Sequence, residues 1–288
     1  MIQAILLSMR PRQWVKNIVV FVPLVFGLRL LRIDLAISSI LVFLTYTAMM
    51  GAVYIFNDIL DYENDRLHPI KKLRPIASGQ LSFRKGWAAV LILALISLFF
   101  AFCINVQLGI LMIFVIIINW LYSCYLKQVV IVDVVCFSLF YIFRLLAGAL
   151  VVEVALSHWV IICTGLLAMF VGFGKRRSEL VLMQKKANKQ RKVLSSYSVP
   201  YLDLCLVIMS SAAILTYILY TVSEQAIYYS GNKLYFTVPF VIYGVMRYLF
   251  LVIEKNKGED PIRIFLRDKG MIGTFILWLI LFGFFLYG

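Results

Sequence analysis

Four acidic residues lie within one short stretch, from Asp58 to Asp65, although the 288-residue chain contains only 14 aspartates and glutamates. On a helix, which turns about 100° per residue, Asn57 and the three aspartates of this stretch fall within roughly a 100° arc of one face, and Glu63 points away. Converging carboxylate and amide oxygens repel one another unless a hard cation such as Mg²⁺ lies among them, typically shared with substrate phosphates. The spacing therefore predicts Asp58, Asp61 and Asp65 as metal ligands. The alternative is a solvated helix end, or a set of counter-charges for the neighbouring arginines and lysines.

A basic segment with two prolines follows the carboxylates directly, from Arg66 to Gly79. Pro69 and Pro75 should end the helix and stiffen a turn-rich loop. Arginine and lysine form charge-assisted hydrogen bonds with phosphate oxygens, so predicted metal ligands and phosphate donors are adjacent in the chain. His68 could serve as a base or as a structural donor, and it receives no catalytic role. The predicted phosphate donors of this loop are Arg66, Lys71, Lys72 and Arg74.

The elements that must position these residues are long apolar segments. Hydrophobic residues make up 63% of the chain and charged residues 15%, which is far from the usual composition of a soluble domain. Several segments reach or approach the roughly 20 apolar residues that a helix needs to cross a bilayer, and none alternates as the strands of a membrane barrel do. The sequence therefore predicts an all-α fold, a polytopic transmembrane helical bundle in a single integral-membrane domain over 1–288. The candidate spans, about nine, are 17–33, 36–57, 84–104, 107–125, 129–151, 157–174, 199–222, 234–254 and 270–288.

Lysines and arginines are distributed unevenly between the predicted spans. With the N-terminus on the cytoplasmic side, the outer loops contain only Arg29, Arg32 and Lys233, and Arg144 and Arg247 lie within spans. All others of the 28 basic residues then fall on the cytoplasmic side, whose loops are enriched in lysine and arginine in membrane proteins. We therefore expect a multi-pass protein of the cytoplasmic membrane whose active site faces the cytoplasm.

The formal net charge of +14 does not by itself identify a function. Topology and contact with anionic membrane lipids account for it, and nucleic-acid binding is not expected. A transporter of an anionic solute would also be basic and polytopic, but it would be expected to show repeated halves or matched broken helices. The sequence shows no such repeat, so a membrane enzyme is favoured.

The acidic stretch reads N-D-x-x-D-x-x-x-D from Asn57 to Asp65, and it resembles the first aspartate-rich motif of the UbiA superfamily of intramembrane prenyltransferases. The resemblance extends over nearly the whole chain, because the spans and the long cytoplasmic loops also match a nine-helix bundle of that kind. It implies a central cavity that opens to the cytoplasm and to lipid, with Mg²⁺ holding a diphosphate near its mouth. Within the superfamily the sequence looks more like the decaprenyl-phosphate phosphoribosyltransferases and their relatives, on segments 68–79, 122–127, 174–180 and 247–250.

The loop after the sixth span departs from the usual prenyltransferase pattern, which has a second aspartate-rich motif there. Its only acid is Glu179, among many basic residues. Such a loop suits substrates with more phosphate to neutralise, so the resemblance implies 5-phosphoribosyl 1-diphosphate as donor and a polyprenyl phosphate of the decaprenyl type as acceptor. The basic residues are Lys175, Arg176, Arg177, Lys185, Lys186, Lys189, Arg191 and Lys192, and the first three are expected to hold a phosphate.

The implied reaction is Mg²⁺-dependent transfer of 5-phosphoribose to the lipid phosphate with release of pyrophosphate. Charge grows on the pyrophosphate as the C1–O bond breaks, so Mg²⁺ on Asp58, Asp61 and Asp65 would stabilise it, and these three are the expected catalytic residues. The lipid phosphate is already anionic and needs positioning more than deprotonation. The alternative is a UbiA-type prenyltransferase that moves a prenyl group from a prenyl diphosphate to an aromatic or other acceptor. Whether the chain forms a homo-oligomer stays open.

Polar residues within or beside the spans are further candidates, because burying them in hydrocarbon is costly. Tyr122 and Lys127 border the loop after the fourth span, and Asp133 and Arg144 lie about three helical turns apart in the fifth. The alternative for each is a hydrogen bond or salt bridge that fixes the packing of the bundle. The substrate-binding residues expected from the sequence are Lys16, Asn57, Arg66, Lys71, Arg74, Tyr122, Lys127, Arg144, Lys175, Arg176 and Arg177.

Overall fold

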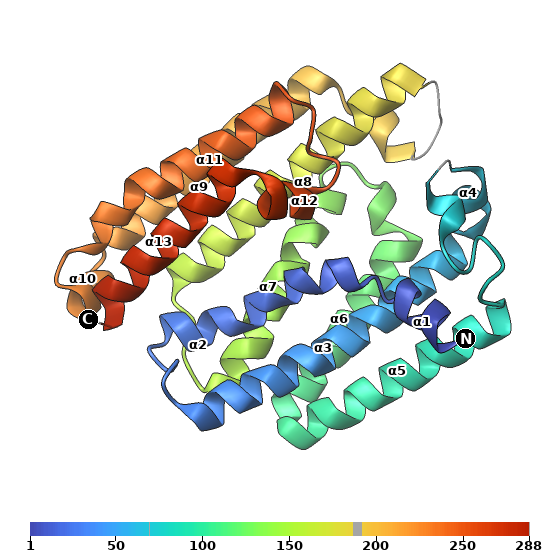
Figure 1. The fold of residues 1–288 in the computed structure, drawn as a ribbon, viewed down its shortest axis with the longest axis horizontal. Coiled ribbons are helices and arrows are strands. Elements are labelled where there is room, and N and C mark those ends of the chain that lie inside the picture. The colour runs from blue at the N-terminus through green and yellow to red at the C-terminus, as the bar shows by residue number, and fades with distance from the viewer. Residues whose placement is uncertain (69, 187–191, 288) are drawn as a thin grey trace. The chain divides into compact units, whose positions relative to one another are not determined.

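The computed structural model describes residues 1–68, 70–186 and 192–287, and every regular element in these ranges is a helix (Figure 1). The predicted all-α fold is confirmed. The α-helices are α1 Ile2–Ser8, α2 Val22–Phe26, α3 Ile33–Leu60, α4 Tyr62–Leu67, α5 Phe83–Ile104, α6 Val106–Cys124, α7 Val132–Val152, α8 His158–Lys186, α9 Val199–Thr221, α10 Glu224–Ser230, α11 Val238–Ile253, α12 Pro261–Arg267 and α13 Lys269–Tyr287. The 3₁₀ helices are η1 Pro11–Phe21, η2 Lys71–Leu73, η3 Leu126–Gln128, η4 Lys192–Ser196 and η5 Leu234–Thr237.

Eight helices of the described ranges are long and apolar enough to cross a membrane: α3, α5, α6, α7, α8, α9, α13 and the continuous segment of η5 and α11. Seven of them coincide within a few residues with predicted spans. The predicted span 157–174 begins where α8 begins, but α8 continues to Lys186, so Lys175, Arg176 and Arg177 lie on a helix and not in the expected loop. Helices are expected here, because in hydrocarbon every backbone N–H and C=O group must be satisfied within the protein. The chain is an integral membrane protein.

The first predicted span, 17–33, has a different structure. Its residues belong mainly to the 3₁₀ helix η1 and the short helix α2, and not to a long α-helix. At about 2.0 Å per residue in a 3₁₀ helix and about 1.5 Å in an α-helix, the two elements together extend about 30 Å, close to the thickness of the hydrocarbon core. Gly148 of α7 permits their close approach, because a Cβ atom there would lie 2.0 Å from the carbonyl oxygen of Val20.

By internal packing the chain divides into two units. The first contains residues 1–127 and 143–156, and the second contains residues 128–142 and 157–288. A single domain over 1–288 stays a prediction.

The first unit is built around α3. Helix α5 runs alongside α3 (Figure 1), and η1 and α6 also pack against it. Tyr46 and Met49 of α3 form a buried core with Leu108 and Met112 of α6. A second core, with Ile55 and other residues near the end of α3, supports the segment that contains the acidic motif.

The second unit is built from α8, α9, α11 and α13. Helix α8 packs along α9, and α11 packs along both α9 and α13. Phe170, Leu202, Leu206 and Tyr248 are among the buried residues of its core.

Large apolar side chains also cover the outside of the helices. On α5, Leu91, Ile92, Leu95 and Phe99 are all exposed. A soluble protein would have to bury such a surface, but in a bilayer the lipid tails are its solvent. The exposure therefore agrees with a helix that lies in the membrane.

Candidate active site

The acidic motif lies in the first unit, at the junction of α3 and α4. Helix α3 ends at Leu60, and Asp61 (φ −89°, ψ 7°) joins the two helices. His68, after the end of α4, is extended (φ −87°, ψ 135°), as the residue before a proline should be. Its Nδ1 accepts hydrogen bonds from the backbone N–H groups of Ile70 (3.0 Å) and Lys71 (3.1 Å). These two hydrogen bonds give His68 a structural role in shaping the loop.

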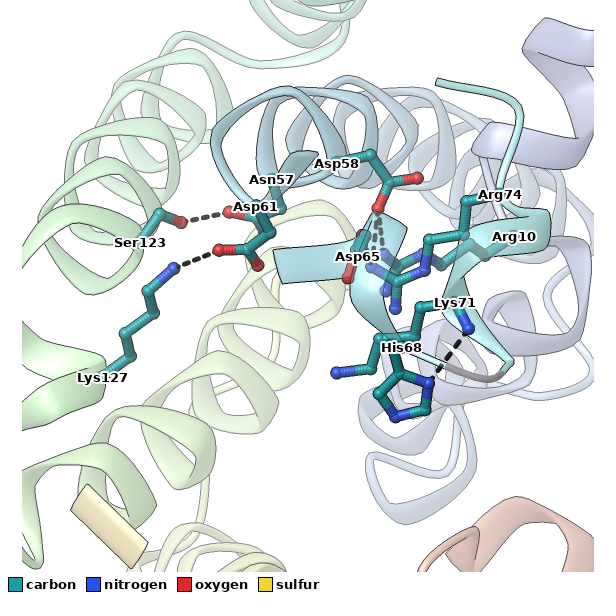
Figure 2. Close-up of polar contacts among 10 residues, drawn as sticks. All are labelled: Arg10, Asn57, Asp58, Asp61, Asp65, His68, Lys71, Arg74, Ser123 and Lys127. Atoms are coloured by element: carbon teal, nitrogen blue, oxygen red, sulfur yellow. Dashed lines mark hydrogen bonds and ion pairs between the residues drawn. The ribbon is translucent and has the colours of Figure 1, made fainter. Parts of the chain in front are cut away.

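Two carboxylates of the motif, Asp58 and Asp65, share Arg74, and Asp58 also pairs with Arg10. Asp58 and Asp65 are only 1% and 2% exposed. Nη1 of Arg74 donates to Asp58 (3.1 Å) and to Asp65 (2.5 Å), and Nη2 of Arg10 donates to Asp58. Figure 2 shows both carboxylates facing these two guanidinium groups. The pairing gives buried charges the partners without which burial would be costly.

Asp61 faces away from the arginines, toward α6 and the turn that follows it (Figure 2). Its Oδ1 accepts a hydrogen bond from Nζ of Lys127 at 2.8 Å. Nearby, the hydroxyl of Ser123 donates to the side-chain oxygen of Asn57. The end of α6 is thereby tied to the acidic motif through two polar contacts.

The motif is therefore not the single helical face expected from the sequence. That expectation assumed an uninterrupted helix, and the change of backbone direction at Asp61 breaks it. Asp58 and Asp65 stay on one side, Asp61 turns to the other, and Glu63 is exposed as expected. The contacts present are those of the alternative, in which the carboxylates neutralise arginines and a lysine.

The donor set fits a hard divalent cation in its chemistry. Three carboxylates and the amide of Asn57 offer oxygen ligands on neighbouring turns, which is what Mg²⁺ prefers. Within the described ranges, no three histidine, cysteine, aspartate or glutamate side chains are grouped closely enough to hold a metal as they stand. Binding would therefore require the carboxylates to exchange a cationic side chain for the metal ion.

Arg10 was not among the site residues expected from the sequence. Its backbone is in the left-handed region (φ 53°, ψ 70°), which costs a residue with a Cβ atom about 1–2 kcal/mol. The carbonyl oxygen of Met9, the residue before Arg10, accepts a hydrogen bond from Nε1 of Trp14 (3.1 Å). The guanidinium of Arg10 lies 5.1 Å from the ring centroid of Tyr54. Because Arg10 and Asp58 are 48 positions apart in the sequence, no local spacing rule indicates their contact.

Arg144 lies in a separate polar network of the first unit and is only 3% exposed. Its Nε donates to Oδ1 of Asn17 (2.7 Å), and Asn17 donates to the hydroxyl of Thr47 (3.0 Å). The guanidinium lies 5.2 Å from the ring centroid of Tyr46. These contacts join α7 to η1 and α3. They are hydrogen bonds that fix the packing of the bundle, which is the alternative that the sequence left open for Arg144.

The other residues expected in the first unit are less buried. Lys16 precedes Asn17 on η1, Tyr122 lies on α6, and Lys71 begins η2; all three are half-buried. Arg66 is exposed on α4, with its guanidinium 5.4 Å from the ring centroid of Tyr62. The expected residues that the structure gathers around the motif are Asn57, Asp58, Asp61, Asp65, Arg74 and Lys127.

Arg176 takes part in a buried ion-pair network of the second unit. Its Nε lies 2.5 Å from Oδ2 of the fully buried Asp133, and its Nη1 lies 2.6 Å from Oε2 of Glu179. Asp133 also accepts a hydrogen bond from the hydroxyl of Tyr197 (3.1 Å), which in turn accepts one from the backbone of Ile131 (2.6 Å). Burial raises the pKa of Tyr197, which keeps the phenol protonated and able to donate. The network joins α7, α8 and the segment before α9.

Arg177 is buried as well and pairs with Asp203 of α9. Its Nη1 also donates to the carbonyl of Val252 (3.1 Å) and to Oδ1 of Asn256 (3.0 Å). Lys175 is half-buried, with Nζ 3.9 Å from Glu179. Outside the described residues lie Lys189, Arg191 and the side chains of Lys185, Lys186 and Lys192.

The fold is that of a polytopic membrane protein, with an acidic motif at the junction of α3 and α4. The model of the UbiA prenyltransferase family matches residues 20–268, and the chain belongs to this family. It is a transferase.

Two curated relatives extend the comparison over nearly the whole chain. The chain is 30% identical over 284 residues to a Mycobacterium tuberculosis protein named decaprenyl-phosphate phosphoribosyltransferase, covering 97% of this chain and 93% of that protein. A Corynebacterium glutamicum protein of the same name is 30% identical over 282 residues, covering 94% of this chain and 83% of the relative.

Solved structures share the fold. A UbiA homolog from Archaeoglobus fulgidus, bound to GPP and Mg²⁺, matches with a TM-score of 0.70 at 19% identity, covering 98% of each chain. The same homolog bound to Cd²⁺ matches with a TM-score of 0.69, also at 19% identity and 98% of each chain. At this identity the likeness concerns the fold alone.

Proposed function

We propose that the chain transfers 5-phosphoribose from 5-phosphoribosyl 1-diphosphate to a polyprenyl phosphate of the decaprenyl type. In this reaction the bond between C1 of the ribose and the diphosphate oxygen breaks. A new bond forms between C1 and an oxygen of the lipid phosphate, and pyrophosphate leaves with the electron pair. No proton has to be removed from the acceptor, because the lipid phosphate is already anionic.

The similarity to the phosphoribosyltransferases over nearly the whole chain carries this proposal. The charge pattern supports it, since the sequence from Lys175 to Ser198 has no second aspartate-rich motif. Its only acid, Glu179, lies on α8 and is paired with Arg176. A chain with one acidic motif and many basic residues suits two phosphorylated substrates.

The carboxylates Asp58, Asp61 and Asp65 would hold Mg²⁺, with Asn57 beside them. When bound, the ion supplies Lewis acidity that neutralises charge on the departing pyrophosphate. Arg74 already lies against Asp58 and Asp65, so its remaining N–H groups are placed at the same spot for a phosphate oxygen. Together they hold the leaving group in one orientation, which is the main contribution a protein makes to transfer of this kind.

The surrounding basic and polar residues would bind the rest of the substrates. Donors at the edge of the motif would come from Tyr122 on α6, Lys127 on η3, Arg66 on α4 and Lys71 on η2. Lys16 and Arg144 are proposed for the part of the first unit that lies deeper in the membrane-spanning helices, where a lipid phosphate would need a cationic partner.

Lys175, Arg176 and Arg177 are proposed as a further phosphate-binding set in the second unit. Lys175 is the most accessible of the three. A phosphate at Arg176 or Arg177 would have to compete with Asp133, Glu179 and Asp203, so these two arginines also hold α8 in place.

We further propose that the protein lies in the cytoplasmic membrane with this site facing the cytoplasm. The distribution of lysine and arginine between the spans supports the orientation. It would give the site access to a soluble phosphoribosyl donor, while the polyprenyl acceptor reaches it from the bilayer.

A conventional prenyltransferase is the second candidate, because the Archaeoglobus fulgidus neighbours are bound to the prenyl diphosphates GPP and DMAPP. The two functions share a metal-linked diphosphate leaving group and differ in the group transferred. Purified protein in detergent should be given labelled 5-phosphoribosyl 1-diphosphate with polyprenyl phosphate and Mg²⁺, and in parallel labelled prenyl diphosphate with aromatic acceptors. A labelled phosphoribosyl lipid in the first reaction supports the proposal, and a prenylated aromatic product in the second alone would overturn it.

A further inference from the structure

Each of the three aspartates of the acidic motif pairs with a cationic side chain. Asp58 faces Arg10, Asp65 faces Arg74, and Asp61 faces Lys127. Arg74 also reaches Asp58, so the two buried carboxylates are joined by a shared guanidinium. A cluster of buried negative charges without such partners would be strongly destabilising.

The partners differ from the carboxylates in their freedom to move. Asp58 and Asp65 are almost fully buried, whereas the side chains of Arg10 and Arg74 are 29% and 25% exposed. Long, partly exposed side chains can turn to another ligand without opening the core. The carboxylates stay where they are, and the cations can leave them.

The chain segment on both sides of Arg10 is fixed. Before it, Met9 packs against Gly51 of α3, where a Cβ atom would lie 2.7 Å from the Met9 side chain. After it, Pro11 begins η1. Between these contacts the backbone of Arg10 is left-handed, and residues kept in such conformations are common at functional sites.

We infer that Arg10 and Arg74 are counter-ions of Asp58 and Asp65, and that they release these carboxylates when a divalent metal enters with a diphosphate. A metal adds two positive charges beside two guanidinium groups and repels them, so binding of the metal alone is opposed. A diphosphate that arrives with the metal supplies oxygens for both guanidinium groups. Metal and diphosphate should therefore bind cooperatively, and Arg10 is a positioning residue that links them.

This inference rests on the proposed metal role of the carboxylates, but not on which group is transferred, since both candidate reactions release pyrophosphate. The probes are Mn²⁺ and inorganic pyrophosphate, with the full chain in detergent. Free Mn²⁺ is measured by electron paramagnetic resonance, with and without pyrophosphate, and each titration is compared with the same mixture lacking protein, because pyrophosphate also binds Mn²⁺ in solution. The variants are R10Q and its matched control R12Q, because Arg12 carries the same charge two residues away and is exposed.

In the wild-type protein, pyrophosphate should tighten Mn²⁺ binding about tenfold or more. R10Q should bind Mn²⁺ alone more tightly than the wild type, because a competitor is gone, and should lose most of the tightening by pyrophosphate. R12Q should match the wild type in both measurements. With a chelator present, R10Q should also have a lower melting temperature than R12Q, and Mn²⁺ should remove that difference.

The outcomes separate this inference from the proposed function. If R10Q binds Mn²⁺ alone as the wild type does, or more weakly, Arg10 is a structural residue and the exchange is wrong. If the wild type and D58N bind Mn²⁺ equally, the carboxylates are not the metal site, which overturns both. Failure to transfer phosphoribose, with the Mn²⁺ results as expected, contradicts the proposed function only.

Discussion

Replacing Asp61 by asparagine tests whether the carboxylates perform the chemistry or only neutralise neighbouring charge. The substitution keeps the size of the side chain and removes the charge that would hold Mg²⁺. Asp61 is 32% exposed, and its partner Lys127 is 20% exposed, so losing this ion pair should cost less than about 1 kcal/mol of folding free energy. The variant should therefore remain folded.

The effect on turnover should be much larger. A catalytic metal contributes several kcal/mol to the transition state, and about 4 kcal/mol corresponds to roughly a thousandfold in rate. The assay is the initial rate at which label from 5-phosphoribosyl 1-diphosphate enters the lipid fraction at saturating substrate. Thermal unfolding of the same preparations reports folding.

Glu63 provides the matched control, because it lies two residues from Asp61, carries the same charge and is exposed. E63Q should keep nearly the full rate. If E63Q proved as damaging as D61N in folded proteins, the acidity of the segment and not this carboxylate would be at work. If D61N kept more than about a tenth of the rate, Asp61 would not hold a catalytic metal.

Three further perturbations follow from the structure. Because Arg176 pairs with the fully buried Asp133, R176A should lower the free energy of unfolding by about 3–5 kcal/mol. K175A should be as stable as the wild type but should raise the Michaelis constant for a phosphorylated substrate. Equal stability of the two variants would contradict the pairing. Chelation should abolish turnover, and added Mg²⁺ should restore it. A cysteine at Lys72 or Ser196 should not react with an impermeant reagent in intact cells, and reaction from outside would refute the orientation.

The membrane helices were predictable from the sequence because lipid imposes a strong constraint on composition. A segment such as Phe83–Ile104 has to be apolar and helical, and both properties can be predicted from the sequence of that segment alone. The segment 17–33 is the exception in shape, since it is apolar but its residues belong mainly to η1 and α2. Hydropathy reports length and polarity, and it does not distinguish a 3₁₀ helix from an α-helix.

The residues of the acidic motif were predictable, but their arrangement was not. The spacing indicated one helical face, and the turn at Asp61 divides it. The contact between Arg74 and Asp58 joins positions 16 apart, and that between Arg10 and Asp58 joins positions 48 apart. Such pairs depend on how separate elements pack, which periodicity in a single segment does not encode.

Identification of the product decides whether the chain transfers phosphoribose to a lipid phosphate. Detergent-solubilised protein is incubated with polyprenyl phosphate, 5-phosphoribosyl 1-diphosphate and Mg²⁺, and the lipid fraction is analysed by mass spectrometry alongside D61N as the inactive control. We expect a polyprenyl phosphate that has gained one phosphoribosyl group, with one pyrophosphate released per product, and neither with D61N. An unmodified lipid phosphate, together with prenyl transfer from a prenyl diphosphate by the same preparation, would contradict it.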